Sequence, residues 1–462
     1  MLLISNGTIV GSGGSKQANI LIDGEKIVKI STEDLSKEAG AKAEVIDAAG
    51  KLIFPGFIDA HTHFDLHVAG TVTCDDFASG TKAAVAGGTT MIIDFGTQYK
   101  GETLLEGKKN WDEKAAFGCS SDYSYHMSIT DWNKEVHAQC EDMMKEGLST
   151  FKVYMTYDTQ LNDEEIYEIL VRLKEVGAFT GCHCENAGMI DALRKEYSSD
   201  ERLTLVSSHY KTRPAEAEAE AIDRYCHLAE VAGAAIMDVH LTCEAGLNEI
   251  REARKRGVRV YAETCPQYLV MDDSLYELPG FEGARYVCAP PLRKKSDQEA
   301  LWQAIAAGEI QTVCTDHCAF TLAQKELGKE DFKKIPGGMP GVETRAEVMY
   351  SEGVAKGRIT KEKLAEVCAE NVARLYGCYP EKGVIAEGSD ADLFILDPNA
   401  KKTITASNQV SRCDYAPLEG MEITGVIEQV FLRGALVAEN GKVIKENTGR
   451  FIKRHAPEMF DL

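Results

Sequence analysis

The sequence of 462 residues contains little that points to a membrane, a nucleic acid or an exported fold. No run approaches the roughly 18 consecutive apolar residues of a transmembrane helix. The N-terminal MLLISNGTIVGSGGS lacks the basic region and small-residue cleavage site of a secretory signal. The net charge is −22, with no basic cluster to contact nucleic acid. We therefore expect a cytoplasmic protein with no nucleic-acid and no membrane partner.

The cysteines are scattered along the chain, and the histidines are few. The 14 cysteines include no C-x-x-C pair, which favours reduced, mostly buried thiols over disulfides or a zinc ribbon. Only 11 residues are histidine, yet two of them stand in one short stretch, FPGFIDAHTHFDL. The few histidines are therefore informative about the site.

The two ends of the chain have the same sequence pattern. Residues 1–52 and 381–462 read as short strands broken by turns such as Asp23-Gly24 and Asn440-Gly441. Both ends are predicted to pair into one small β-sandwich domain with a C-terminal tail.

The middle of the chain, residues 53–380, alternates apolar runs with helical patterns such as EEIYEILVRLKEVG and EAEAEAIDRYCHLAEVAG. Eight strand-like runs occur in order: LIFPGFIDAH, TTMIIDF, DYSYHMSI, TFKVYM, AFTGCHCEN, AAIMDVHLT, VRVYAETCP and IQTVCTDHCA. Eight strand-then-helix units predict an α/β fold, a (β/α)8 TIM barrel whose active-site groups project from the carboxyl ends of the strands.

The first run ends in His-x-His. Alternate residues of a strand face the same way, so the imidazoles of His61 and His63 can reach one metal ion. This spacing alone is a weak signal, because two polar side chains at a barrel rim would give the same pattern.

Other strand ends strengthen the metal hypothesis. Lys152, His183, His240 and Asp316 stand at the ends of the fourth, fifth, sixth and eighth runs, and their imidazole and carboxylate donors suit zinc or a similar divalent ion. Lys152 is the unusual member, since a lysine is ordinarily a cation. It is either a salt-bridging rim residue or a neutral amine that takes up CO₂ as a carbamate, and spacing does not choose between these.

The motifs resemble the D-hydantoinase and dihydropyrimidinase branch of the amidohydrolase superfamily over essentially the whole chain. They include GFIDAHTHFDL, FKVYMTYDTQLNDEE, HCEN, VHLT, AETCPQYL, APPLR, TDHCAF and DYAPLEG. The resemblance implies that one zinc ion is bound by His61, His63 and Asp316 and a second by His183 and His240. A carboxylated Lys152 would bridge the two ions.

The resemblance further implies hydrolytic opening of a cyclic ureide, of hydantoin or dihydropyrimidine type, to an N-carbamoyl amino acid. Asp316 would act as base and acid, and Tyr157 would donate a hydrogen bond to the substrate carbonyl. Backbone groups around Ala289 and Gly337 would hold the imide edge. At these two positions the family usually has Ser and Asn, so the resemblance does not specify the natural ring substrate of this chain. A homotetramer is also implied.

Three other functions fit parts of the pattern. Dihydroorotase is disfavoured because Phe64 follows the His-x-His where an arginine would pair with an anionic substrate. Allantoinase remains a chemically similar alternative. A non-catalytic dihydropyrimidinase-related scaffold is disfavoured because such proteins lose the metal-site residues that this chain keeps.

Overall fold

The computed structural model describes residues 1–462 and contains a barrel sheet and a second, separate sheet. The barrel strands are parallel and follow one another in sequence order: β6 (Phe57–Thr62), β9 (Thr89–Thr97), β10 (Asp122–Ser128), β11 (Thr150–Tyr154), β12 (Phe179–His183), β13 (Ile236–Asp238), β14 (Val260–Thr264) and β15 (Thr312–Val313). The two ends of the sheet meet where Thr62 pairs with His317. The predicted (β/α)8 barrel, with all eight strands in the expected order, is confirmed.

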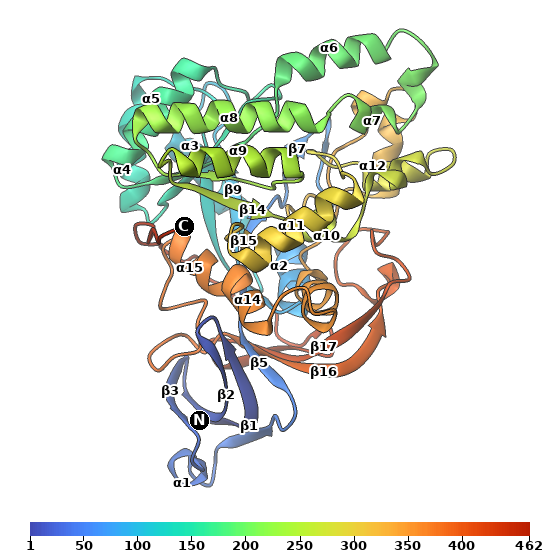
Figure 1. Ribbon diagram of the computed structural model, residues 1–462. Coiled ribbons are helices and arrows are strands. Elements are labelled where there is room, and N and C mark those ends of the chain that lie inside the picture. Colours follow the sequence, from blue (N-terminus) through green and yellow to red (C-terminus); the bar gives the residue numbers. More distant parts are fainter.

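Helices cover the outside of the barrel (Figure 1). They are α2 (Phe77–Ala86), α3 (Leu104–Ala115), α4 (Lys134–Lys145), α5 (Asp163–Glu175), α8 (Ala215–Ala232), α9 (Glu244–Lys255) and α11 (Lys295–Ala307). Their ends follow local chemistry: the Asn162 side chain accepts the Glu165 N–H at the start of α5, and Gly233 ends α8 with a φ of 62°. Both helical patterns read from the sequence are therefore confirmed.

Further helices lie in the loops after the strands. Between β12 and α8 lie α6 (Ala187–Tyr197) and α7 (Ser208–Lys211), and α6 extends away from the barrel (Figure 1). After β14 comes α10 (Pro266–Val270), and after β15 come α12 (Leu322–Lys325), α13 (Arg345–Met349), α14 (Lys361–Ala365) and α15 (Asn371–Leu375).

The strands from the two chain ends form one nine-stranded, mostly antiparallel sheet (Figure 1). Its strands are β1 (Leu2–Gly11), β2 (Gly14–Asp23), β3 (Lys26–Ser31), β4 (Glu44–Asp47), β5 (Leu52–Pro55), β16 (Leu393–Thr403), β17 (Glu422–Leu432), β18 (Ala435–Glu439) and β19 (Lys442–Val443). The two halves join where β5 lies between β1 and β16, as expected from the sequence. The chain then passes at Gly56 into β6 of the barrel.

The remainder of the C-terminal segment returns to the barrel. Phe451 pairs with Tyr123 of β10, the buried Arg454 guanidinium donates to Ser124 Oγ at 2.9 Å, and the Tyr261 hydroxyl donates to the Phe460 carbonyl at 2.7 Å. The tail therefore helps to hold the barrel strands in place.

Burial explains why the strands read as continuous apolar runs. Every residue of β6 and β9 is buried, because both faces of a parallel barrel sheet are covered. All 14 cysteines are free, and all but Cys74 are buried, in agreement with the expectation of reduced thiols. No helix has the length and apolar character needed to span a bilayer.

Candidate metal centre

The carboxyl ends of the barrel strands bring the predicted metal-ligand residues together. His61 lies on β6, Lys152 on β11 and His183 on β12, while His63, His240 and Asp316 lie within three residues of the ends of their strands. All six converge at one mouth of the barrel, as the strand-end argument predicts.

Three of these residues form a set with metal-ligand geometry. The Oδ1 atom of Asp316 lies 3.2 Å from His61 Nε2 and 3.2 Å from His63 Nε2. The donor atoms of His61, His63 and Asp316 all lie within 4.8 Å of one another. Two imidazoles and a carboxylate fit a divalent ion such as zinc.

Two further histidines lie beside this set. The His240 ring is 5.2 Å from the His61 ring and 4.5 Å from the His183 ring. The His240 Nε2 atom is buried without any hydrogen-bond partner, and such atoms are costly unless a ligand is bound. Burial lowers the pKa of His61, His183 and His240, so all three present neutral imidazoles.

Lys152 lies in the middle of the cluster. Its Nζ is 2.9 Å from His61 Nε2 and 4.0 Å from the centre of the Phe95 ring. Burial lowers the pKa of Lys152 to about 8. The side chain forms no salt bridge at the rim, which argues against the first of the two alternatives for this residue and favours an amine that can lose its proton.

Two buried carboxylates that the sequence reading missed orient the histidines. Glu263 Oε1 lies 2.5 Å from His61 Nδ1, and Glu185 Oε2 lies 2.7 Å from His183 Nε2. A carboxylate that accepts one ring proton fixes the tautomer and leaves the other nitrogen free for a metal. Both residues stand in quoted motifs, AETCP and HCEN, where an acidic residue near a strand end was the available signal.

The pKa values of Glu263 and Glu185 are shifted in opposite directions. Burial raises the pKa of Glu263 to about 8. Burial would also raise the pKa of Glu185, but the buried Arg213 and His183 hold it below its ordinary value. Arg213 forms an ion pair with Glu185 Oε2, so His183, Glu185 and Arg213 form one buried hydrogen-bonded chain.

Three residues at this mouth have a strained backbone conformation. Tyr157, His240 and Asp316 have φ values of 73°, 47° and 52°, in the left-handed region that side-chain-bearing residues rarely adopt. Such conformations persist where the surroundings enforce them, and they cluster at functional sites.

Tyr157 lies at the edge of the cluster, in the loop after β11. Its ring centre is 4.9 Å from that of His183, and the Arg213 guanidinium lies 5.3 Å from the Tyr157 ring. The residue is 38% exposed. Burial of its hydroxyl raises the pKa of Tyr157, so the group remains a hydrogen-bond donor.

Ala289 and Gly337 lie against each other although 48 positions separate them in the numbering. A Cβ placed on Gly337 would be 3.8 Å from both the Ala289 Cβ and the Ala289 N. Neither the Ala289 N–H nor the Gly337 N–H donates to any protein atom. Ala289 is partly exposed and Gly337 is exposed, so both donors are available to a ligand.

Two other polar residues near the site, Asp59 and His317, have purely structural contacts. Asp59, which shares the strand face of His61, instead accepts hydrogen bonds from Thr315 N at 3.1 Å and Thr315 Oγ1 at 2.7 Å. The buried His317 lies 3.1 Å from Asp75 Oδ2 and accepts the Gly341 N–H at 3.1 Å. It therefore links the segment after β15 to the following loop.

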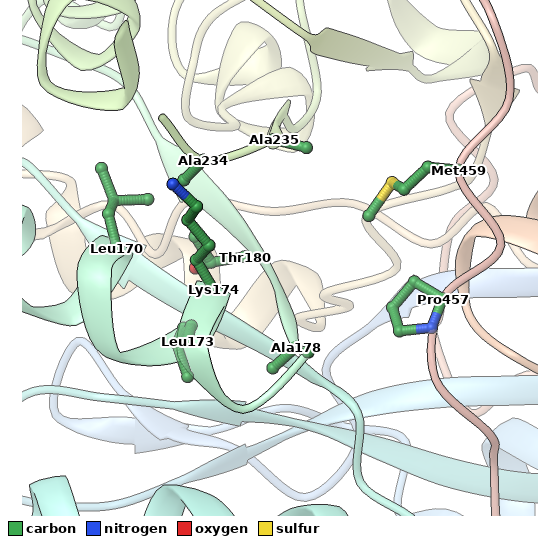
Figure 2. A pocket seen from close by; sticks show the side chains of 10 residues that line it. Leu170, Leu173, Lys174, Ala178, Thr180, Ala234, Ala235, Pro457 and Met459 are labelled. Carbon is green, nitrogen blue, oxygen red and sulfur yellow. The ribbon is translucent and has the colours of Figure 1, made fainter. Parts of the chain in front are cut away.

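A cavity of about 190 Å³ occurs elsewhere in the molecule (Figure 2). It lies at the amino ends of β12 and β13, where Ala178, Ala234 and Lys174 face Pro457 and Met459 of the C-terminal tail. No histidine or carboxylate lines it, so it has none of the chemistry of the strand-end cluster.

Comparison with known proteins agrees with this geometry. The model of the Amidohydrolase family matches residues 52–437, which is most of the chain. The chain belongs to the amidohydrolase family. Among curated relatives, this amidohydrolase is 44% identical to the D-hydantoinase of Geobacillus stearothermophilus over 457 residues, covering 98% of this chain and 96% of that protein. It is 40% identical to a D-phenylhydantoinase of Escherichia coli strain SE11, covering 98% of each chain.

Solved structures similar to this amidohydrolase include a dihydropyrimidinase from Brevibacillus agri NCHU1002, with a TM-score of 0.96, 43% identity and 99% of each chain covered. An L-hydantoinase from Arthrobacter aurescens matches with a TM-score of 0.89 and 30% identity, covering 98% of this chain and 99% of that one. The D-hydantoinase and dihydropyrimidinase resemblance read from the motifs is confirmed.

Proposed function

We propose that this amidohydrolase opens the ring of a cyclic ureide, of hydantoin or 5,6-dihydropyrimidine type, to give an N-carbamoyl amino acid. The observation that carries the proposal is the buried convergence of His61, His63, Lys152, His240 and Asp316 at the barrel mouth. The names of the relatives, D-hydantoinase, D-phenylhydantoinase and dihydropyrimidinase, point to the same substrate class.

The residues fit a pair of divalent ions, which we propose to be zinc. His61, His63 and Asp316 would hold one ion, and His183 and the unpartnered His240 Nε2 the other. The neutral Lys152 amine would add to CO₂, forming an N–C bond and releasing one proton, to give N6-carboxylysine as an anionic bridge. Ions held there supply Lewis acidity toward water and toward the ring carbonyl.

The protein groups have separate tasks in the hydrolysis. Asp316 would accept a proton as water adds to the ring carbonyl carbon, and then give that proton to the ring nitrogen as the C–N bond breaks. The Tyr157 hydroxyl would donate to the carbonyl oxygen as negative charge develops on it. The free N–H groups of Ala289 and Gly337 would hold the imide edge of the ring.

The departures at Ala289 and Gly337 leave these backbone donors in place. They remove the Ser and Asn side chains usual in the family, which could narrow the site. A Cβ on Gly337 would meet its neighbours at ordinary contact distance. We further propose that the protein is a homotetramer, on the resemblance, and that it works in the cytoplasm, where its 14 free cysteines would stay reduced.

A substrate panel tests the proposal. Purified protein loaded with zinc is assayed for ring opening of hydantoin, phenylhydantoin, 5,6-dihydrouracil and allantoin. We expect hydrolysis of five- or six-membered cyclic ureides, with release of an N-carbamoyl amino acid. Turnover of allantoin alone would favour the allantoinase alternative. A protein that retains no zinc and opens none of these rings would favour the non-catalytic scaffold.

A further inference from the structure

Lys325, the last residue of α12, is a second buried lysine outside the metal centre. Its side chain is almost completely buried, and it forms no ion pair. Its Nζ donates to three backbone carbonyls: Val287 at 2.8 Å, Pro336 at 2.7 Å and Gly338 at 2.8 Å. The three N–H donors of an ammonium are therefore all used.

The environment of this lysine differs from that of the other fully bonded buried lysine. Lys382 pairs with three carboxylates, Asp122, Asp390 and Asp392, so its charge is neutralised. Lys325 has only carbonyl dipoles and the Phe320 ring, whose centre is 5.6 Å from Nζ. Burial lowers the pKa of Lys325 to about 8, and three carbonyl acceptors favour the charged form. At neutral pH the site therefore contains an uncompensated buried cation.

The three carbonyls belong to the two segments that contain Ala289 and Gly337. The Val287 carbonyl also accepts the Gly338 N–H at 2.9 Å, so Lys325 and this bond tie the segments together. The second segment lies beside the metal centre, since Met339 pairs with His317, the residue after Asp316.

One of these peptide groups points to a role beyond packing. The Pro336 carbonyl and the Gly337 N–H belong to the same peptide bond, and this N–H has no partner in the protein. A cation on the oxygen of a peptide group withdraws electron density and makes its N–H a stronger donor, because hydrogen bonds in a chain polarise one another.

We propose that Lys325 is a positioning residue that fixes and polarises the Gly337 N–H as a donor to a carbonyl oxygen of the ring substrate. The inference rests on the proposed hydrolysis of a cyclic ureide. The Gly337 N–H would contact this carbonyl oxygen equally in the bound substrate and in the transition state. The contact therefore contributes mainly to binding of the substrate.

The first test is spectroscopic and needs no turnover. The chain contains four Pro–Gly pairs: Pro55–Gly56, Pro279–Gly280, Pro336–Gly337 and Pro340–Gly341. Labelling proline with carbonyl ¹³C and glycine with ¹⁵N restricts a carbonyl-correlated amide spectrum to these pairs, and loss of one signal in Gly337→Ala assigns Gly337. In Lys325→Gln, which keeps two donors but no charge, we expect the Gly337 amide proton to shift upfield while Gly56 and Gly280 stay unchanged.

The second test separates binding from catalysis. For Lys325→Gln and Lys325→Met we expect the KM for hydantoin or dihydrouracil to rise about ten- to a hundredfold, less than the loss caused by deleting a whole donor. The kcat should remain within about threefold, with metal content unchanged. Lys329→Met, a change at an exposed lysine on the same segment, is the matched control and should behave as the wild type.

A lysine that only holds the loop would give a different result. The variants would then lose kcat or folded protein, with KM unchanged. An active Lys325→Gln enzyme with an unshifted Gly337 amide and a wild-type KM would overturn the inference. Failure of the proposed function is distinguishable, because the wild type would then turn over no cyclic ureide, whatever the Gly337 amide shows.

Discussion

The Nζ atom of Lys152 lies 2.9 Å from the Nε2 atom of His61, inside a cluster of neutral imidazoles. A buried lysine with a pKa near 8 and no carboxylate partner is poised to lose its proton. An amine in that state can be carboxylated, which converts a repulsive neighbour of a metal site into an anionic one. Binding of two metal ions in this amidohydrolase, as proposed above, depends on that conversion.

Replacement of this amine should remove both metal binding and activity. In Lys152→Ala we expect the zinc content to fall by more than half and hydrolysis of hydantoin to become undetectable, as measured by elemental analysis and a ring-opening assay. A short carboxylic acid such as propionate should restore part of the activity by occupying the vacated space. Lys145→Ala, at an exposed position of α4, is the control. Full metal content and activity in Lys152→Ala would refute the bridging role.

The histidines should divide into two metal-binding groups. His63→Asn should reduce retention of one ion, and His240→Asn that of the other, so each variant is expected to bind about half the zinc of the wild type. Each buried imidazole lost from a site removes one ligand of a small set. His227→Asn, which changes a largely exposed histidine, should retain full stoichiometry. Equal and complete retention in all three variants would contradict the assignment.

Glu263 should strengthen metal binding through His61. Glu263→Gln keeps the shape of the side chain but replaces the carboxyl group that lies 2.5 Å from His61 Nδ1 with an amide. We expect metal affinity to fall about ten- to a hundredfold, the usual effect of losing such a partner. Competition with a chromophoric chelator measures it, and an unchanged affinity would mean that Glu263 serves packing alone.

The Tyr157 hydroxyl should affect catalysis and leave the metals in place. In Tyr157→Phe we expect kcat/KM to fall about a hundred- to a thousandfold, the typical loss for one donor to a developing oxyanion. The metal content should be unchanged. Tyr167→Phe, at a similarly exposed tyrosine of α5, should have wild-type kinetics. If both variants behaved alike, Tyr157 would be only a rim aromatic.

Glu343 provides a test of stability against pH. Burial raises its pKa from the ordinary value of 4.5 to about 7, although the backbone N–H groups of Val410 and Ser411 favour the charged form. The folded chain therefore binds more protons than the unfolded chain between these values, and stability falls as pH rises through the window. The contribution is on the order of 1–3 kcal/mol.

Glu343→Gln should remove this part of the pH dependence. We expect the melting temperature of the wild type to fall more than that of the variant between about pH 5 and about pH 8, as followed by differential scanning fluorimetry. Glu330→Gln, at an exposed position, should follow the wild type. Parallel curves for the wild type and Glu343→Gln would show that Glu343 is ionised throughout.

The sequence predicted the elements whose signal is local. The barrel strands were readable because parallel strands are apolar on both faces, and His61, Lys152 and His183 were readable because they end such strands. Even β15, with only two residues, was predicted from the apolar run IQTVCTDHCA.

The residues that orient the site were not predictable in the same way. Arg213 reaches Glu185 from a loop 28 positions away, and Lys325 meets Val287 and Pro336 through contacts that only the folded loops create. No periodicity in the sequence identifies residues that make such long-range contacts. The left-handed backbone at Tyr157, His240 and Asp316 was equally invisible, because side-chain type at these positions does not require it.

The most direct measurement is ¹³C NMR of the active, zinc-loaded protein equilibrated with ¹³C-labelled bicarbonate. We expect a slowly exchanging carbamate resonance that is absent from Lys152→Ala and that disappears together with activity when the metal is removed. A fully active enzyme without any such resonance would contradict the proposed carboxylation of Lys152.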